Sequence, residues 1–153
     1  MNPLINYHYT LPFKEVNSFL FLPYGVDETC YKDRILPQIP RIVDTLNKFR
    51  ESRQAAISVN NNINNSCMMG LGFQIVKNKL IVCVTMRSQC KTNGRPSDTV
   101  MIQYISTLVM KALGLKQYKV YVTVWNYHNN VELTKENDSN EEVQRNIKLL
   151  VSS

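Results

Sequence analysis

Apolar and polar positions repeat along the chain with two different periods, which predict a mixture of helices and strands. Four segments carry apolar residues at the spacing of helices: 13–22, 42–49, 99–113 and a terminal stretch at 141–151. Four others are short apolar or alternating runs typical of strands: 55–59, 67–76, 79–86 and 119–125. Lys77-Asn78 separates the two central runs, so we expect an antiparallel pair there. The predicted class is α+β, a mixed or antiparallel sheet packed on helices.

Both ends of the longest predicted helix are marked by its sequence. Asp98 stands at its start, where a carboxylate is a favourable cap, and Gly114 follows its last apolar position. The apolar face expected on this helix consists of Val100, Tyr104, Leu108 and Ala112.

Length and composition predict one globular domain over residues 1–153. Hydrophobic residues make up 44% of the chain, enough for a real core. No apolar run approaches the roughly 20 residues that span a bilayer. The first ten residues lack the cationic start and apolar block of a signal peptide. We therefore expect a cytoplasmic protein without a membrane partner.

The net charge of +6 indicates an anionic partner. The basic residues are dispersed, without the clusters or interleaved aromatic residues typical of nucleic-acid binding. A few arginines that bind a small phosphate would account for the same charge, so charge alone does not decide between these partners. The four cysteines show no paired spacing and only two histidines are present, so no metal site is expected.

Arg87-Ser88 and the segment 94–98 form the most informative motif. An arginine and a serine at the end of a core strand can donate several hydrogen bonds to a phosphate. The segment Gly-Arg-Pro-Ser-Asp at 94–98 then opens the long helix and places polar side chains beside the same position. Alone, the motif is weak, because arginines at strand ends are more often solvated or structural.

The order and spacing of six segments resemble those of thymidylate synthases and their relatives that hydroxymethylate deoxycytidylate. In that family an Arg-Ser pair follows the catalytic cysteine by 20 positions, as Arg87-Ser88 follows Cys67 here. A Gly-x-Pro segment then opens a long helix, as at 94–98. The remaining matches are the Lys-Leu pair at 79–80, Ser-Arg at 52–53, a helix opened by Glu15, and the segment 125–130. Hydroxymethylases of this kind are familiar from bacteriophages, so the resemblance suggests a viral source.

The resemblance implies a transferase that modifies carbon 5 of a pyrimidine nucleoside monophosphate. Carbon 6 of the ring is a poor electrophile, and addition of a thiolate there makes carbon 5 nucleophilic. Cys67 corresponds to that thiolate, and we expect nearby guanidinium groups to lower its pKa. Glu15 corresponds to the residue that organises water and moves protons.

The resemblance also implies the residues that bind the nucleotide. Arg87 and Ser88 correspond to ligands of the 5′-phosphate, and Tyr127 to a ligand of the sugar hydroxyl. Arg53 corresponds to an arginine that crosses a dimer interface to a second copy's phosphate. This implies a homodimer packed sheet to sheet.

Asp98 departs from the asparagine with which uridylate enzymes read the base. An ionised carboxylate only accepts hydrogen bonds, which suits the exocyclic amine of cytosine, and the hydroxymethylases carry the same Asp. The predicted substrate is therefore dCMP or CMP, with dUMP as the alternative. A plain helix cap remains the alternative role of Asp98.

Other departures affect the cofactor side of the site. The resemblance implies 5,10-methylenetetrahydrofolate as one-carbon donor, but Cys90 stands where the family has the Asp that contacts the pterin, and Trp125 replaces a His. These changes argue against folate use. They also leave open a catalytically inactive protein that binds pyrimidine nucleotides for sequestration or regulation.

Overall fold

The computed structural model describes residues 2–21, 31–60 and 66–129. The predicted terminal helix at 141–151 and Cys30 lie outside these residues.

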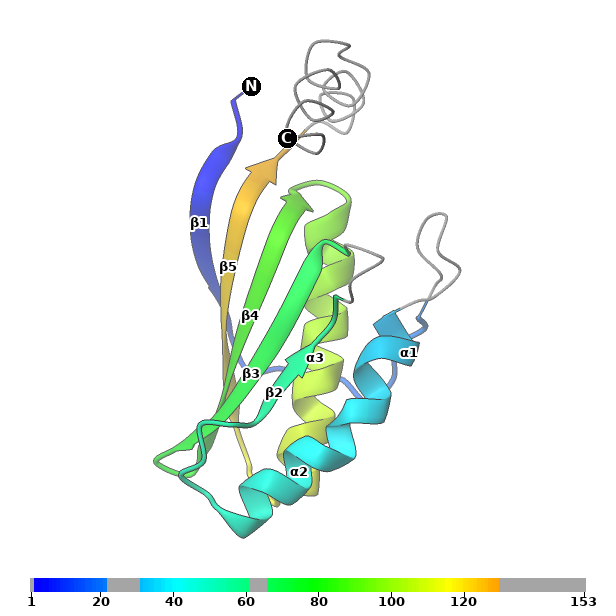
Figure 1. Ribbon diagram of the computed structural model, residues 1–153. Helices are drawn as coiled ribbons and strands as arrows, with labels where there is room; N and C mark the ends of the chain where they lie inside the picture. Colours follow the sequence, from blue (N-terminus) through cyan, green and yellow to red (C-terminus); the bar gives the residue numbers. More distant parts are fainter. Residues whose placement is uncertain (1, 22–30, 61–65, 130–153) are drawn as a thin grey trace, which may run out of the picture.

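A five-stranded sheet forms the centre of the fold, with the order β1-β5-β4-β3-β2 (Figure 1). Its strands are β1 (Leu4–Leu11), β2 (Ala56–Ser58), β3 (Met68–Val76), β4 (Lys79–Cys90) and β5 (Tyr118–His128). β4 and β5 run parallel, whereas the other neighbouring pairs are antiparallel. This mixed sheet on helices confirms the predicted α+β class.

The helices cover one face of this sheet (Figure 1). They are α1 (Tyr31–Ile35), the 3₁₀ turn η2 (Leu36–Gln38), α2 (Ile39–Lys48) and α3 (Gly94–Ala112). Proline in the first turn of α2 suits a helix start, because the amide it lacks would have no helical partner there. No helix in this described part of the chain is both long and apolar enough to cross a bilayer.

The hairpin of β3 and β4 has the predicted two-residue turn. Lys77 and Asn78 adopt φ angles of 50° and 60°. Two successive positive φ angles give the turn whose twist matches that of the flanking strands. The β3–β4 register is therefore set locally.

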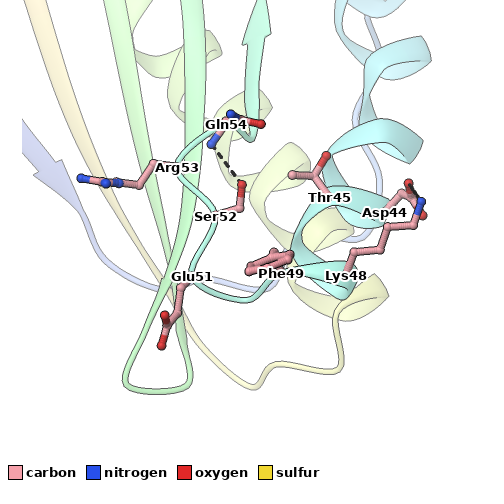
Figure 2. A pocket seen from close by; sticks show the side chains of 8 residues that line it. All are labelled: Asp44, Thr45, Lys48, Phe49, Glu51, Ser52, Arg53 and Gln54. Carbon is pink, nitrogen blue, oxygen red and sulfur yellow. Dashed lines mark hydrogen bonds and ion pairs between the residues drawn. The ribbon is translucent and has the colours of Figure 1, made fainter.

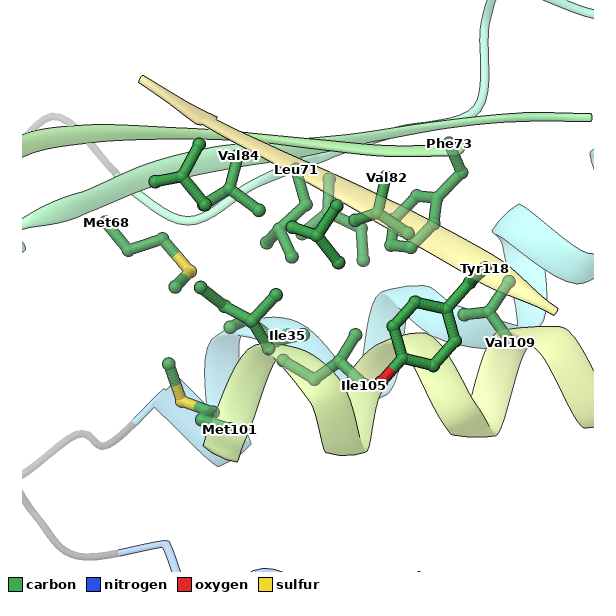
Figure 3. Close-up of a cluster of buried hydrophobic side chains, with 14 of the residues drawn as sticks. Ile35, Met68, Leu71, Phe73, Val82, Val84, Met101, Ile105, Val109 and Tyr118 are labelled. Carbon is green, nitrogen blue, oxygen red and sulfur yellow. The ribbon is translucent and has the colours of Figure 1, made fainter. Parts of the chain in front are cut away.

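The core lies between the sheet and α3 (Figure 3). Alternate side chains of β4 and β5, such as Val82 and Tyr118, point toward Ile105 and Val109 of α3 and are almost completely buried. On the opposite face of the sheet, Tyr121 and Trp125 remain 43% and 48% exposed. One face of the sheet is thus covered by helices, and the other presents large apolar side chains.

The predicted helix at 13–22 is wrong for the residues described, since residues 12–21 are irregular. The Lys14 amide donates to the Tyr118 hydroxyl at 3.1 Å, and the Val16 amide to Thr107 Oγ1 at 3.1 Å. The Tyr118 hydroxyl donates to the Lys14 carbonyl. Side chains of α3 and β5 therefore take the backbone groups that a helix would pair internally.

α3 differs from its prediction in its start and in its buried face. It begins at Gly94, so Asp98 lies inside the helix and is not its cap. The buried apolar positions include Met101, Ile105 and Val109, whereas Val100 is 39% exposed. Apolar residues surround much of α3, so spacing alone could not identify the face that meets the sheet. Gly114 ends the helix as predicted, with φ of 70°.

Candidate functional site

Cys67 and Arg87 meet where β3 begins and β4 approaches its end. The Arg87 amide donates to the Cys67 carbonyl at 2.6 Å, and Arg87 Nη2 lies 3.9 Å from Cys67 Sγ. Both side chains are exposed. Antiparallel pairing of the two strands therefore places a thiol beside a guanidinium at an accessible position.

The expectation that Cys67 has a lowered pKa is wrong. The protein around the thiol disfavours the charged thiolate and raises the pKa of Cys67, although the side chain reaches the surface. The Arg87 charge lowers this pKa by a smaller amount, and the Asp98 charge raises it. The effect of Asp98 also shows that its carboxylate lies within electrostatic range of the thiol.

β4 and β5 both change the phase of their burial just beyond the apolar core. Met86 and Val124 are buried in the regular alternation, but the next buried residues are Gln89 and Tyr127, three positions later in each strand. The two strands remain paired, with Gln89 opposite Tyr127. The shift turns a polar and an aromatic side chain inward at this end of the sheet.

Asp98 is bound by Gln89 in this polar region. Gln89 Nε2 donates to Asp98 Oδ2 at 3.0 Å, and the Tyr9 hydroxyl donates to Gln89 Oε1 at 2.7 Å. Burial raises the pKa of Asp98 to about 6, against a smaller lowering by the Gln89 hydrogen bond. Burial also raises the pKa of Tyr9 to about 12, so Tyr9 stays a donor at neutral pH.

Arg95 links the aromatic side chains of the region. Its guanidinium lies 4.0 Å from the centre of the Tyr9 ring, and its Nη1 donates to the Tyr127 hydroxyl at 2.9 Å. Tyr127 stacks on Tyr7 with ring centres 4.6 Å apart. The Tyr127 hydroxyl, predicted to bind sugar, is therefore held beside a cation at the edge of the same cluster.

Ser88 pairs with a histidine that the sequence did not single out. Ser88 Oγ lies 3.0 Å from His128 Nε2. His128 Nδ1 is buried and has no hydrogen-bond partner among the described residues. The Ser88 hydroxyl thus has a fixed neighbour on β5.

Arg53 lies toward the other end of the sheet. The Phe73 amide donates to the Ala55 carbonyl, so residues before Ala55 lie beyond the middle of β3. At about 3.3 Å per residue, Phe73 is roughly 17 Å along the strand from Met68, the residue after Cys67. Within one chain, the structure does not bring Arg53 to Cys67.

Arg53 borders a cavity of about 610 Å³. Figure 2 shows its guanidinium pointing away from Asp44 and Lys48. The cavity is lined by Asp44, Thr45, Lys48, Phe49, Glu51, Ser52, Arg53 and Gln54.

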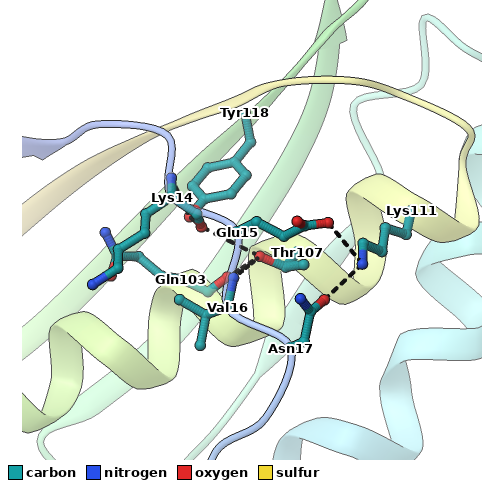
Figure 4. Close-up of polar contacts among 8 residues, drawn as sticks. All are labelled: Lys14, Glu15, Val16, Asn17, Gln103, Thr107, Lys111 and Tyr118. Atoms are coloured by element: carbon teal, nitrogen blue, oxygen red, sulfur yellow. Dashed lines mark hydrogen bonds and ion pairs between the residues drawn. The ribbon is translucent and has the colours of Figure 1, made fainter.

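Glu15 is also separated from Cys67, and it does not open a helix. Its carboxylate lies 2.7 Å from Lys111 Nζ near the carboxyl end of α3 (Figure 4). The hydrogen bond and charge of Lys111 lower the pKa of Glu15. Asp98 and Lys111 are 13 residues apart on α3, or about 20 Å at 1.5 Å per residue. The structure therefore does not bring Glu15 to Cys67 within one chain.

Of the three cysteines that the structure describes, Cys90 is the one whose pKa is lowered. Its main cause is a hydrogen bond with Thr92, whose Oγ1 lies 3.5 Å from Sγ, and the amides of Asn93 and Gly94 add to it. These amides belong to the start of α3, where unpaired N–H groups favour negative charge. In the sequence, Cys90 stands out only because it replaces the Asp that contacts the pterin in the resembled family.

Several neighbours of the predicted residues were missed, namely Tyr9, Gln89, Arg95 and His128. Tyr9 belongs to the alternating Tyr-His-Tyr segment at 7–9, a strand signal that could have been used. Gln89 depends on the shift in β4, for which the sequence gives no local signal. Among the described residues there is no group of three potential metal ligands.

No protein-family model matches the sequence, and no curated protein matches it. The fold is nevertheless similar to that of solved structures. One is the crystal structure of thymidylate synthase from T4 phage, with a TM-score of 0.58 and 19% identity. The similarity covers 65% of this chain and 37% of that protein, so the chain spans well under half of its length. The chain therefore has a thymidylate synthase-like fold, as expected, while the identity is too low to show more than the fold.

Proposed function

We propose that the chain binds a pyrimidine nucleoside monophosphate and modifies carbon 5 of the base, with Cys67 as nucleophile. The observation that carries this proposal is the contact of Cys67 with Arg87 at one end of a thymidylate synthase-like sheet, with Asp98 within electrostatic range of the thiol. A thiol, a cation and a carboxylate are the groups needed to attack the ring, hold a phosphate and read the base.

The reaction begins when the Cys67 thiolate forms a bond to carbon 6 of the base. The electron pair of the 5,6 double bond moves toward carbon 5, which then takes up an electrophile or a proton. Loss of the original carbon 5 proton and departure of the thiolate restore the ring. Because burial raises the pKa of Cys67, the thiolate fraction is small at neutral pH, and the rate should increase with pH.

The remaining predicted residues supply binding. Arg87 and Ser88 hold the 5′-phosphate, and Tyr127 binds the sugar. Arg53 lies far from Cys67 within one chain, so it serves the phosphate only across a homodimer. The uncovered sheet face with Tyr121 and Trp125 is the surface through which two copies would pack.

The described residues do not support a folate site. Cys90 occupies the position expected to contact the pterin, and Glu15 lies at the other end of α3. Asp98 favours dCMP or CMP over dUMP, because its carboxylate accepts from the amine that only cytosine carries.

A second candidate function is a catalytically inactive nucleotide-binding protein. Two observations favour it, namely the raised pKa of Cys67 and the separation of Glu15 from the thiol. Binding alone requires neither a reactive thiolate nor a proton-transfer group.

Exchange of tritium from carbon 5 of labelled dCMP or dUMP distinguishes the two functions. The enzyme releases tritium to water without any folate, Cys67→Ala abolishes the release, and Lys116→Ala in the exposed segment between α3 and β5 leaves it unchanged. Micromolar binding without release would support the inactive protein. Loss of release in Cys90→Ala but not in Cys67→Ala would show that the nucleophile is assigned wrongly.

A further inference from the structure

Gln89 has no part in the proposed function, yet it connects Asp98 to the first strand. The side chain is 2% exposed and makes two hydrogen bonds, one to Asp98 and one from Tyr9. An amide offers one accepting oxygen and one donating nitrogen. The Gln89 oxygen therefore accepts from Tyr9 on β1, and its nitrogen donates to Asp98 on α3.

The direction of these hydrogen bonds follows from the charges involved. The reversed amide would turn Gln89 Oε1 toward an ionised Asp98, oxygen against oxygen, which is repulsive. Tyr9 keeps its proton at neutral pH, because its pKa is about 12, and donates it to Oε1. Tyr9 therefore holds Gln89 in the orientation in which Nε2 faces Asp98.

This arrangement makes the two oxygens of Asp98 unequal. Oδ2 accepts from Gln89, whereas Oδ1 has no hydrogen-bond partner among the described residues and is not completely enclosed. Oδ1 is thus the oxygen that a ligand meets. When Asp98 takes up a proton, Oδ1 carries it, because Oδ2 is already accepting.

We propose that Gln89, held by Tyr9, is a positioning residue that reserves Oδ1 of Asp98 for the base and thereby selects cytosine over uracil. This inference rests on the proposed function. Ionised Oδ1 accepts from the amine at carbon 4 of cytosine and repels the carbonyl oxygen of uracil. Protonated Oδ1 donates to that carbonyl instead. Without the Gln89 hydrogen bond the pKa of Asp98 rises, so the carboxyl group takes up a proton more readily and can donate to the carbonyl of uracil.

The preference should therefore change with the protonation of Asp98. The other groups near Asp98 are Cys67 before β3, Cys90 on β4, Tyr9 on β1 and Arg95 on α3. The pKa values of Cys67 and Arg95 are raised and that of Tyr9 is about 12, so these three groups do not titrate between pH 5 and pH 8. The pKa of Cys90 is lowered, so the same measurements on Cys90→Ala separate its charge from that of Asp98.

The nucleotide phosphate is common to dCMP and dUMP, so its effect cancels in the ratio of the two dissociation constants. Protonation of cytosine N3 in acid does not cancel in this ratio, but it is the same for the wild type and the variants, so the comparison with Gln89→Met isolates the effect of Asp98.

The experiment measures the dissociation constants of dCMP and dUMP by calorimetry at about pH 5 and pH 8. We expect the wild-type protein to prefer dCMP by about tenfold at pH 8, the equivalent of about 1.4 kcal/mol, and to lose most of this preference at pH 5. Gln89→Met, of similar volume but unable to hydrogen bond, should reduce the preference to about twofold at both pH values. Tyr9→Phe should give an intermediate result, and Gln117→Met in the exposed segment between α3 and β5 should match the wild type.

A second measurement does not need the ligand. Carbon-13 NMR of the Asp98 carboxyl should show a higher pKa in Gln89→Met, because the Gln89 hydrogen bond stabilises the ionised form. Unchanged titration, or an unchanged preference in a protein that binds both nucleotides, would overturn the role of Gln89. If neither nucleotide binds to the wild type, the proposed function fails, and the titration alone decides whether Gln89 positions Asp98.

Discussion

A carboxylate lies at each end of α3: Asp98 belongs to the helix, and Glu15 contacts it through Lys111. The two carboxylates have opposite properties. At the amino end Asp98 is 6% exposed, its partner is the neutral Gln89, and its pKa is raised to about 6. At the carboxyl end Glu15 is exposed, its partner is the cation Lys111, and its pKa is lowered. Both residues were assigned to one site by resemblance, but only Asp98 lies near Cys67.

The difference shows how the environment separates a candidate functional group from an ordinary surface one. A buried carboxylate without a cation costs free energy, whereas an exposed ion pair costs little and contributes little. Asp98 therefore needs an explanation that Glu15 does not. The following variants test this contrast.

The largest expected effect concerns the middle of α3, which holds both ends in place. Ile105 is completely buried between the sheet and the helix, and Ile105→Ala should reduce the free energy of unfolding by about 3 kcal/mol. Val100→Ala, on the partly exposed side of the same helix, should cost less than about 1 kcal/mol. Urea denaturation measures both, and equal losses would show that the core is wrongly placed.

The next effect is the pH dependence contributed by Asp98. Its pKa in the folded protein, about 6, exceeds its usual value of 3.8, so the folded protein binds the proton more tightly than the unfolded chain. The stability that proton binding by Asp98 contributes is complete below about pH 3.8 and is lost as the pH rises through about 6. The loss amounts to about 3 kcal/mol at most.

Asp98→Asn should remove that loss. We expect the variant to unfold at higher urea concentration than the wild type at pH 7, and its stability to change less between pH 4 and pH 7. Binding data should show the preference moving from cytosine toward uracil. A variant less stable than the wild type at pH 7 would contradict the raised pKa of Asp98.

A smaller effect is expected from the hydroxyl of Tyr118, which anchors residues 12–21 near the carboxyl end of α3. Tyr118→Phe removes its hydrogen bonds with the Lys14 backbone and should cost about 1 kcal/mol. Hydrogen exchange of the Lys14 and Val16 amides should become faster. Tyr121→Phe on the uncovered sheet face is the matched control, and a similar loss there would contradict the anchoring role.

The smallest effect is expected from the ion pair of Glu15. Because its pKa is lowered, the stability it adds is present above its usual pKa and is lost as the pH falls through the lower folded value. Glu15→Gln should slightly lower the melting temperature at pH 7, and the difference should disappear as the carboxylate is protonated in acid and at high salt. A difference that persists in acid would mean that the carboxylate is not paired as described.

The elements that the sequence predicted correctly depend on local patterns. The β3–β4 hairpin follows from Lys77-Asn78, and β5 follows from alternating apolar residues. β1 was missed because most of its side chains are polar or exposed. Residues 12–21 were misjudged because their backbone partners, Thr107 and Tyr118, are about a hundred positions away.

The residues of the candidate site also fall into two groups, those that local sequence patterns reveal and those that they do not. The approach of Cys67 to Arg87 follows once two adjacent strands are recognised, and Asp98 follows from the segment that opens α3. The contacts of Gln89 require the matched shift in β4 and β5, and those of Tyr9 require the register of β1 against β5. Both are set by tertiary packing, so residue spacing could not reveal them.

The place of β1 at the edge of the sheet has a consequence for the order of assembly. The β3–β4 hairpin closes over two residues, whereas β1 pairs with a strand more than a hundred positions away, and such distant pairings form slowly. We expect a folding chain to form its β3–β4 hairpin well before β1, which carries Tyr9, pairs with β5. Ligand recognition would then be the last property to mature, and amide protection in β1 should lag behind that in β4 during refolding.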